Sequence, residues 1–388
     1  MIRTQPHIDG EAAPRSASAR AYKTVAFAPA LADPAFCAAW TRLEASAALP
    51  TQGLAFVTAL ACSMLAGADI NVFAVAHEIG GQELAARGWE GLAALLPLYR
   101  DASSRPHRWR MPGAREVYEP CDALYDSPEA AHRLAQAIAG QSQPVSLDRI
   151  PAQSLLVPTL RAAMKGRGLV SVRSALPCPT ITLGPAWEHP DDQFNAGRRS
   201  DFRRAARKAA AMGAVTYEVH APDPDTFDRW FDEALDVELH SWKKEAGTAM
   251  ASDRAKADFF RAFFRAASAA GTFRVAFVRI DGQPAAMQLA IEHAARFWLF
   301  KIGYDERFGK CSPGTLLMLH TLRYAASRGL IAYELLGNIE PWISELWTRD
   351  HHECVRLRTY PFSIAGLTAL AVDGGDWLRQ RLFPETGP

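Results

Sequence analysis

Cysteine is scarce in this chain and widely scattered. The 388 residues contain six cysteines and no C-x-x-C pair, the spacing on which many zinc sites depend. A disulfide framework is typical of shorter chains that are much richer in cysteine. The adjacent pair His351-His352 does not change this, because neighbouring side chains point in different directions and no third ligand accompanies them. The sequence therefore predicts reduced thiols, no metal site and a cytoplasmic protein.

The chain also lacks an excess of charge and a hydrophobic run of membrane-spanning length. Lys and Arg number 43 and Asp and Glu 42, so the formal net charge is +1, which argues against a generally nucleic-acid-binding surface. The apolar stretch Leu54–Ala66 has 13 residues, whereas a transmembrane helix needs about 20. We expect a buried helix there and no transmembrane segment. Residues 1–21 lack the apolar core of a signal peptide and are expected to be a disordered leader.

What is present is the composition of an ordinary globular protein. Hydrophobic residues make up 49% of the chain and charged residues 22%, and a length of 388 residues favours two domains. The polar segment Gly184–Asn195, which contains two prolines, suggests the join. Both halves combine helical segments with runs of strand length. The sequence therefore predicts an α+β protein with domains over residues 22–187 and 188–388.

The most informative stretch runs from Phe273 to Gly337. Phe273–Ile280 is rich in β-branched and aromatic residues and ends at the turn dipeptide Asp281-Gly282. Two more apolar runs follow, and then the loop YDERFGKCSPG, with two glycines and two cations. A helix is expected over Pro313–Arg328, followed by the short strand IAYELLG. A loop of this kind at a helix N-terminus can hold phosphate on backbone N–H groups.

Four segments, in serial order, resemble a known family. They are RRSDFRRAARKAAAMG, LHSWKKEAG, the strand-loop-helix stretch that begins FRVAFVRIDG, and YELLGNIEPWISELWT. They resemble the acetyltransferase domain of the cellulose-biosynthesis-type group in the GNAT superfamily, which are acyl-CoA-dependent N-acyltransferases related in fold to the Fem-type peptidyltransferases. The first half shows the resemblance more weakly. The resemblance implies two GNAT-like domains, each a mixed, mostly antiparallel sheet flanked by helices.

The resemblance also implies a binding site for the pyrophosphate of acyl-CoA. In the GNAT pattern, backbone N–H groups of the loop after the fourth strand hold this group, helped by the helix dipole. The corresponding residues here are Arg307, Gly309, Lys310, Ser312, Gly314 and Thr315. The cations offer charge, the glycines allow close approach, and Ser312 is expected to cap the helix that starts at Pro313. The alternative is a capped helix after an ordinary loop.

N-acylation needs a base for the amine and a proton for the leaving thiolate. Glu334, inside the apolar strand IAYELLG, matches an acidic residue of the family, and burial would raise its pKa toward neutrality. Asp305 is a second candidate base, and Tyr304 a candidate proton donor. The alternatives are a solvated Glu334 or one paired with an arginine such as Arg323, a turn cap at Asp305 and a packing role for Tyr304.

On the acceptor side, the resemblance points to the Ser-Trp-Lys segment and to a later Glu-Pro-Trp. Trp242 could stack on a sugar ring, with His240 or Lys243 reaching its polar groups, and Trp342 belongs to a second acceptor-side loop. The alternative is an ordinary helix C-terminus, in which Trp242 anchors the core and Lys243 complements the helix dipole.

A basic helix is expected near Arg198, where six cations and one acid lie between Arg198 and Lys208. Most charge runs are solvated helix faces, and this is the first interpretation. A grip on an anionic sugar carrier or glycan is the second. Transfer RNA is the third, because the Fem-type relatives use aminoacyl-tRNA as donor.

Together these features predict an N-acyltransferase that uses acetyl-CoA or another acyl-CoA as co-substrate and no metal. The C-terminal domain is expected to bind the donor, and the N-terminal domain to complete the acceptor cleft. The resemblance implies acetylation of an amino group on a sugar or polysaccharide precursor, with peripheral contact to membrane-linked precursors. Two alternatives stay open: a Fem-type transferase that draws on aminoacyl-tRNA, and a non-catalytic scaffold or regulatory protein.

Overall fold

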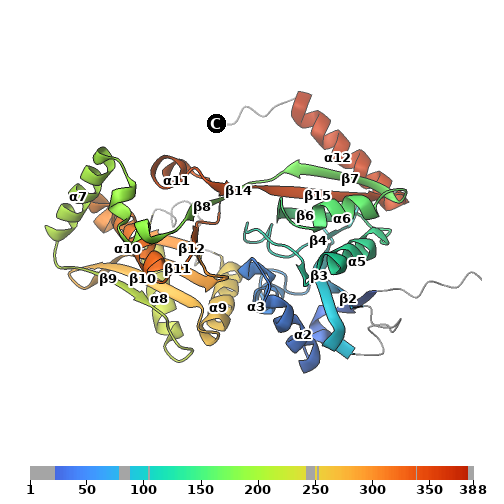
Figure 1. Cartoon of the computed structure of the whole chain (residues 1–388), viewed down its shortest axis with the longest axis horizontal. Helices are drawn as coiled ribbons and strands as arrows, with labels where there is room; N and C mark the ends of the chain where they lie inside the picture. The colour runs from blue at the N-terminus through green and yellow to red at the C-terminus, as the bar shows by residue number, and fades with distance from the viewer. Residues whose placement is uncertain are drawn as a thin grey trace, which may run out of the picture.

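The protein consists of two β-sheets that lie side by side, each flanked by helices (Figure 1). This computed structural model describes residues 22–77, 88–103, 105–241, 250, 253–337 and 339–382. The leader expected over residues 1–21 lies outside them. Because both sheets are mixed and carry helices, the predicted α+β class is confirmed.

The first sheet has the strand order β1-β2-β3-β4-β6-β15-β7, with β5 paired to β3. Its strands are β1 (Tyr22–Ala26), β2 (Ile70–Ala76), β3 (Leu92–Asp101), β4 (Arg108–Arg110), β5 (Leu124–Tyr125), β6 (Val145–Pro151), β7 (Gly168–Ser174) and β15 (Cys354–Pro361). Only the β4–β6 pair among these strands is parallel.

The second sheet has the order β14-β8-β13-β12-β11-β10-β9. Its strands are β8 (Cys178–Thr182), β9 (Val215–His220), β10 (Phe273–Ile280), β11 (Gln283–His293), β12 (Arg296–Tyr304), β13 (Ala332–Glu334) and β14 (His351–His352). Only the β12–β13 pair among these strands is parallel. A connection between parallel neighbours needs a crossover, and here the crossover contains α10.

The helices expected over Leu54–Ala66, near Arg198 and over Pro313–Arg328 are present among the helices of the structure. The helices of the structure are α1 (Phe27–Ala30), α2 (Pro34–Glu44), α3 (Leu54–Cys62), α5 (Pro128–Ala139), α6 (Leu156–Ala163), α7 (Ala196–Ala210), α8 (Phe227–Leu239), α9 (Arg254–Ala269), α10 (Pro313–Ser327), α11 (Pro341–Leu346) and α12 (Ile364–Leu382). Local sequence explains the start of α5, because the Ser127 hydroxyl accepts a hydrogen bond from the Ala130 N–H at 3.2 Å and proline occupies the first helical position.

The middle strands of the second sheet are buried on both faces. In β10, Val275 and Phe277 belong to the core cluster that includes α8 and α9, whereas Ala276 and Val278 pack in the cluster of α10. This two-sided burial explains why the strand reads as a continuous apolar run and does not alternate between apolar and polar residues.

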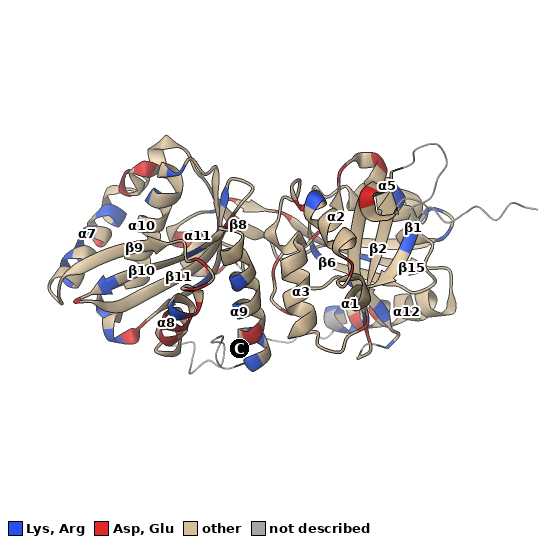
Figure 2. Cartoon of the chain, turned by 90° about the horizontal axis from the view of Figure 1, so that it is seen from below, with Lys and Arg blue, Asp and Glu red and all other residues tan. Residues whose placement is uncertain are grey.

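The two halves share a continuous hydrophobic core. Helix α3 of the first half packs against α9 of the second, and both figures place these helices next to each other between the sheets (Figures 1 and 2). The ring of Phe56 meets Phe259 and Phe263 edge-on, with centroid distances of 5.4 and 5.2 Å. Apolar contact between the halves therefore fixes their relative position.

The division of the chain between the sheets differs from the expected ranges 22–187 and 188–388. Strand β8 precedes residue 187 but pairs with β13 in the second sheet. Strand β15 lies near the C-terminus but inserts between β6 and β7 of the first sheet, where α12 packs on it. The chain thus crosses between the sheets twice. The polar composition of a segment predicts a loop, but it does not predict with which strand the neighbouring strands pair. The two crossings could therefore not be found from the sequence.

In the part of the chain that the structure describes, no helix combines the length and apolarity needed to cross a membrane.

Candidate functional site

Strands β12 and β13 form a fork. They pair from Arg296–Ala332 to Trp298–Glu334, after which β13 ends and β12 continues to Tyr304. A register shift opposite Leu289 and Ala290 adds a residue to β12, and such a bulge bends a strand locally. The pairing between β12 and β13 therefore ends at Trp298 and Glu334.

The predicted anion loop follows β12 directly. It forms a 3₁₀ turn over Glu306–Cys311 and leads into α10 at Pro313. A Cβ added at Gly314 would meet no atom within 4 Å, so the first turn of α10 is open on that side. Ser312 occupies the expected N-cap position before Pro313, but it adopts a left-handed conformation with φ 49° and its side chain makes no capping hydrogen bond, so the expected side-chain cap is wrong. The N–H groups of Thr315 and Leu316 donate to the Ser312 carbonyl at 3.0 and 3.3 Å, which leaves the Gly314 N–H, on the open side of the turn, as the group suited to an anion.

The cations near the loop come from two places. Lys310 is exposed and Thr315 half-buried at the start of α10, while the basic helix α7 packs against the 3₁₀ turn and α10. Figure 2 shows Lys and Arg along α7. Burial raises the pKa of Cys311 at the end of this turn, and the positive charge of Lys208 on α7 opposes the rise. The fold thus places the basic helix beside the loop.

Asp305 and Arg307 hold each other at the start of the loop. The Asp305 carboxylate accepts from the Arg307 N–H at 2.9 Å and from its guanidinium at 2.6 and 2.9 Å. Burial would raise the pKa of Asp305, but these hydrogen bonds and the charge of Arg307 lower it. Asp305 therefore serves as a turn cap, and Arg307 is partly neutralised.

The remaining predicted residues are spread over several elements. His240 ends α8, and its carbonyl accepts from the Glu306 N–H at 3.3 Å, so it lies beside the loop. Tyr304 is half-buried in the α10 core cluster. Trp342 is 38% exposed on α11 and donates to its neighbour Glu340. Trp242 and Lys243 lie outside the described residues.

Glu334 is buried, with a side chain 1% exposed, and is paired with Arg296 and His352. It accepts a hydrogen bond from Arg296 of β12, and His352 Nε2 of β14 lies 3.0 Å from its carboxylate. Burial alone would raise its pKa, but the His352 and Arg296 interactions outweigh burial and lower it. The expected rise in pKa is therefore wrong. The expected alternative partner Arg323 instead donates to the carbonyl of Glu188.

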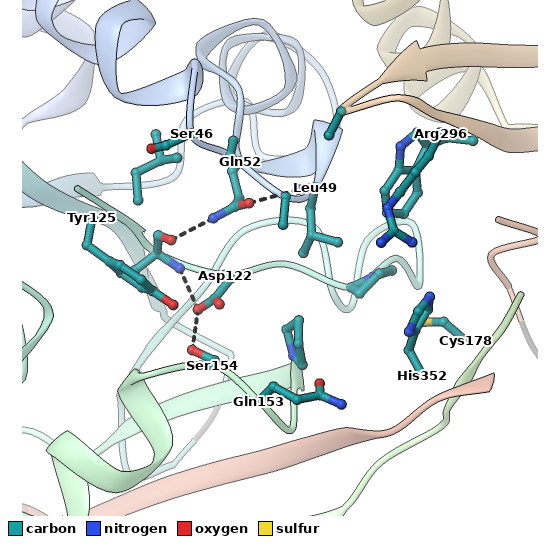
Figure 3. Close-up of a pocket in the computed structure, with 18 of the residues that line it drawn as sticks. Ser46, Leu49, Gln52, Asp122, Tyr125, Gln153, Ser154, Cys178, Arg296 and His352 are labelled. Atoms are coloured by element: carbon teal, nitrogen blue, oxygen red, sulfur yellow. Dashed lines mark hydrogen bonds between the residues drawn. The ribbon is translucent and has the colours of Figure 1, made fainter. Parts of the chain in front are cut away.

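A pocket of about 560 Å³ lies between the two halves (Figure 3). One wall comes from the first half, including residues 45–49, 120 and 122–125, and the other from β8, β12, β14 and β15. Polar side chains gather at two places in Figure 3: Gln52, Asp122, Tyr125 and Ser154 on one side, and Arg296 and His352 on the other. Its size and its mixed lining suit a small molecule.

Asp122 is a carboxylate in the wall of the pocket. Its Oδ1 accepts from Ser154 Oγ and from the Ala123 N–H, both at 2.8 Å. Burial raises its pKa to about 7 in spite of these hydrogen bonds. Asp122 can therefore exchange a proton near neutral pH.

A second buried carboxylate, Glu119, reaches the end of the fork from the first half. Its side chain lies 3.5 Å from the N–H of Gly337, which follows β13. Burial raises its pKa, against the opposing charges of Arg149 and of Lys301 on β12. Glu119 therefore brings a carboxyl group of the N-terminal half to Gly337, just beyond the end of β13.

Sequence reasoning missed Glu119, Asp122 and Arg149, and treated His352 only as half of a histidine pair. Residues 119–122 read as a polar loop with a proline, which is normally solvated. The sequence gives one weak indication of these buried acids, which is that Glu119 and Asp122 lie close together between two apolar strands. Packing of this loop against the other half is what buries the acids.

Across the described residues, no group of three or more His, Cys, Asp or Glu side chains is placed to hold a metal ion.

The sequence of the second half matches a family of known proteins. Residues 196–343 match the family model of an acetyltransferase (GNAT) domain, a span that contains α7, the fork and the anion loop. No curated protein matches the sequence. The match supports an acyltransferase whose residues 196–343 form a GNAT-type domain.

Solved structures resemble the chain over both halves. A crystal structure of FemX has a TM-score of 0.53 at 11% identity, covering 87% of this chain and 98% of its own. A conserved protein of unknown function from Bacteroides thetaiotaomicron has a TM-score of 0.51 at 10% identity, with 83% and 97% coverage. The C-terminal domain of a putative lysylphosphatidylglycerol synthetase from Agrobacterium fabrum gives 0.49 at 12% identity, with 87% and 95% coverage. At these identities the first two likenesses show the fold alone.

Proposed function

We propose that this protein transfers an acyl group, acetyl in the simplest case, from acyl-CoA to an amino group of a sugar or polysaccharide precursor. One observation carries the proposal: the fork, the anion loop and the N-terminus of α10 follow one another inside the segment that matches the acetyltransferase (GNAT) domain. The cellulose or exopolysaccharide setting rests on the sequence resemblance described above.

In this proposal, the anion loop and α10 bind the pyrophosphate of the donor. The N–H of Gly314 donates to a phosphate oxygen, whereas that of Thr315 already donates to the Ser312 carbonyl. Lys310 and the cations of α7 supply positive charge. Arg307 contributes less, because Asp305 already holds its guanidinium. The pantetheine arm runs along β12 beyond Trp298, so that the thioester lies in the fork.

The acceptor enters from the pocket between the halves. The apolar part of the wall, which includes Trp298, suits the face of a sugar ring. Asp122 and Ser154 at one place and Arg296 and His352 at the other offer partners for hydroxyl, amino or anionic groups. Trp298 belongs both to the pocket wall and to the last pair of the fork, so the pocket and the fork are adjacent.

Glu119 replaces Glu334 as our candidate general base. A base works best when its pKa lies near the operating pH; the pKa of Glu119 is raised, whereas that of Glu334 is lowered. Glu119 would accept the proton of the attacking amine, and the leaving thiolate takes a proton from Tyr304 or from solvent. Glu334 would then hold Arg296 and His352 in position at the pocket.

Calorimetric titration with acetyl-CoA tests the donor site. We expect micromolar binding that weakens about tenfold in Lys310→Ala, because each charge-assisted hydrogen bond contributes about 1.5 kcal/mol. Gly314→Val should weaken it further, since its side chain would fill the space that the donor needs. Lys165→Ala, an exposed cation on the first half, is the matched control and should bind like the unaltered protein. Absence of binding to any acyl-CoA would reject the proposal.

The rate of CoA release tests whether Glu119 is the general base. Release of CoA from acetyl-CoA in the presence of glucosamine and related amino sugars should fall at least a hundredfold in Glu119→Gln, whereas acetyl-CoA binding persists. If Glu119→Gln turns over normally and Glu334→Gln does not, the original assignment of Glu334 is right and ours is wrong.

A second candidate is a transferase that draws on aminoacyl-tRNA. The observation that favours it is the row of exposed cations on α7, which a phosphate backbone could contact. In that case, charged tRNA should bind with a steep salt dependence, and Arg203→Ala and Arg207→Ala should reduce the slope, while acetyl-CoA binds weakly or not at all.

A further inference from the structure

Two buried thiols face each other at the boundary between the sheets. The sulfur atoms of Cys178 and Cys354 lie 3.8 Å apart, and the two residues are 4% and 2% exposed. Cys178 begins β8 of the second sheet, and Cys354 begins β15 of the first. A covalent bond between them would therefore join the two halves of the molecule at the point where the chain crosses between the sheets.

The thiols can be reached by a small oxidant. Both cysteines line the pocket between the halves, next to His352, and Figure 3 shows Cys178 beside His352 at one side of it. A pocket of about 560 Å³ admits a molecule as small as peroxide without unfolding. Both cysteines thus combine low exposure with a place in the wall of this pocket.

Positive charge and hydrogen bonds surround the pair. Arg149 Nη2 donates to Cys178 Sγ at 3.2 Å, and the same guanidinium is held by the carbonyls of Pro177, at 3.1 Å, and Gly337. The hydrogen bond from Cys178, together with the charges of Arg149 and His352, outweighs burial and lowers the pKa of Cys354. A thiolate at Cys354, with a neighbouring thiol as resolving partner, is the arrangement of oxidant-sensitive cysteines.

We propose that Cys178 and Cys354 form a reversible disulfide when the protein meets hydrogen peroxide. The Cys354 thiolate attacks one peroxide oxygen, which breaks the O–O bond, gives a sulfenic acid and releases hydroxide. The Cys178 thiol then attacks the sulfenic sulfur and displaces the hydroxyl group as water. In balance, two thiols lose two electrons and two protons, and one peroxide becomes two water molecules.

The bond requires only a small movement of the side chains. The sulfur atoms must approach from 3.8 Å to the bonding distance of about 2.05 Å. The product ties β8 to β15 and fixes the wall of the pocket that carries His352. Because the linked residues lie far apart in the chain, the bond also restricts the unfolded chain and should raise the thermal midpoint.

Peptide mapping of the full-length protein tests the proposal. The protein is treated with a few equivalents of hydrogen peroxide, quenched with catalase, denatured in N-ethylmaleimide and digested. We expect a cross-linked peptide pair containing Cys178 and Cys354 and the loss of two of the six alkylatable thiols. Dithiothreitol should restore both, and the oxidised protein should melt at a higher temperature than the reduced one.

Single substitutions supply the controls. Cys178→Ser and Cys354→Ser should each abolish the cross-link, whereas Cys62→Ser, which removes an exposed thiol, should leave it intact. The peptide mapping uses the unaltered protein, so its result remains valid even if a variant fails to fold. If peroxide oxidises Cys62 while Cys178 and Cys354 both remain alkylatable, or if their cross-link resists dithiothreitol, the proposal is overturned. Acetyl-CoA binding plays no part in this readout, so the result is independent of the proposed function.

Discussion

At the scale of single residues, the site differs from expectation mainly in how its carboxylates are paired. Glu334 was expected to be a base with a raised pKa, but its partners Arg296 and His352 keep it ionised. The pKa of Asp122 is raised because burial outweighs its hydrogen bonds from Ser154 and Ala123, and that of Glu119 is raised because burial outweighs the charges of Arg149 and Lys301. Burial is common to all three, so the neighbouring charges decide the direction of each shift.

Glu334→Gln should destabilise the protein by about 1–3 kcal/mol, because it leaves Arg296 and His352 without their buried counter-charge. The lowered pKa means that Glu334 stabilises the fold above the unfolded-state value of 4.5 and that this contribution is lost as pH falls through the folded value. Urea unfolding at pH 7 and at pH 3.5 measures both effects. The exposed Glu345→Gln is the control, and an equal loss of stability in the two variants would contradict the role of the pair.

Asp122→Asn should become progressively more stable than the unaltered protein as pH rises from about 4 to 7. The folded-state pKa of about 7 lies above the unfolded value of 3.8, so the native state binds the extra proton and loses stability over this window. The difference should level off above pH 7, with an upper bound of about 4 kcal/mol. Chemical denaturation at pH 4.5, 6 and 8 checks this, with the exposed Asp225→Asn as control; a pH-independent difference would show that Asp122 titrates normally.

At the scale of elements, the contact between α3 and α9 holds the two halves together, and it does so with aromatic rings. This contact also determines where residues 119–122 of the first half lie relative to the second half. Residues 119–122 of the first half reach the fork and the pocket only if the halves keep their present arrangement. From the sequence, Leu54–Ala66 was expected to be a buried helix, but its packing partner α9 was not predicted.

Phe56→Ala should cost about 3–5 kcal/mol, because a fully buried ring is removed from an aromatic cluster. It should also weaken the coupling between the halves, so that thermal unfolding broadens or splits into two transitions. Calorimetry measures both quantities. Leu367→Ala, on the exposed side of α12, should change stability by less than about 0.5 kcal/mol, and a comparable loss in both variants would argue against a special role for this contact.

At the scale of the whole molecule, the chain does not divide into two segments that each contain one sheet. The first sheet takes β15 from the C-terminal region as an internal strand, and the second takes β8 from the N-terminal half. Each sheet is therefore completed by a strand from the far side of the expected boundary. The walls of the pocket come from both sheets for the same reason.

The isolated segment 22–187 should accordingly fail to fold. Without β15, strands β6 and β7 lose the partner between them, and their backbone groups and apolar faces are left exposed. Circular dichroism and denaturant titration should show no cooperative transition. Adding residues 188–388 in trans should restore one. A cooperative transition in the isolated segment would mean that the first sheet is stable without β15.

The local sequence determined the elements and their order. Helix starts such as Pro313, the strands β10 to β12 and the anion loop follow from caps, periodicity and turn residues, which act over a few positions. The tertiary structure alone decided which strands pair, which carboxylates are buried and which charges they meet. Glu334 illustrates the difference, because its strand was predictable, whereas Arg296 and His352 come from strands 38 and 18 residues away. A pKa depends on neighbours in space, and only the folded chain brings those neighbours together.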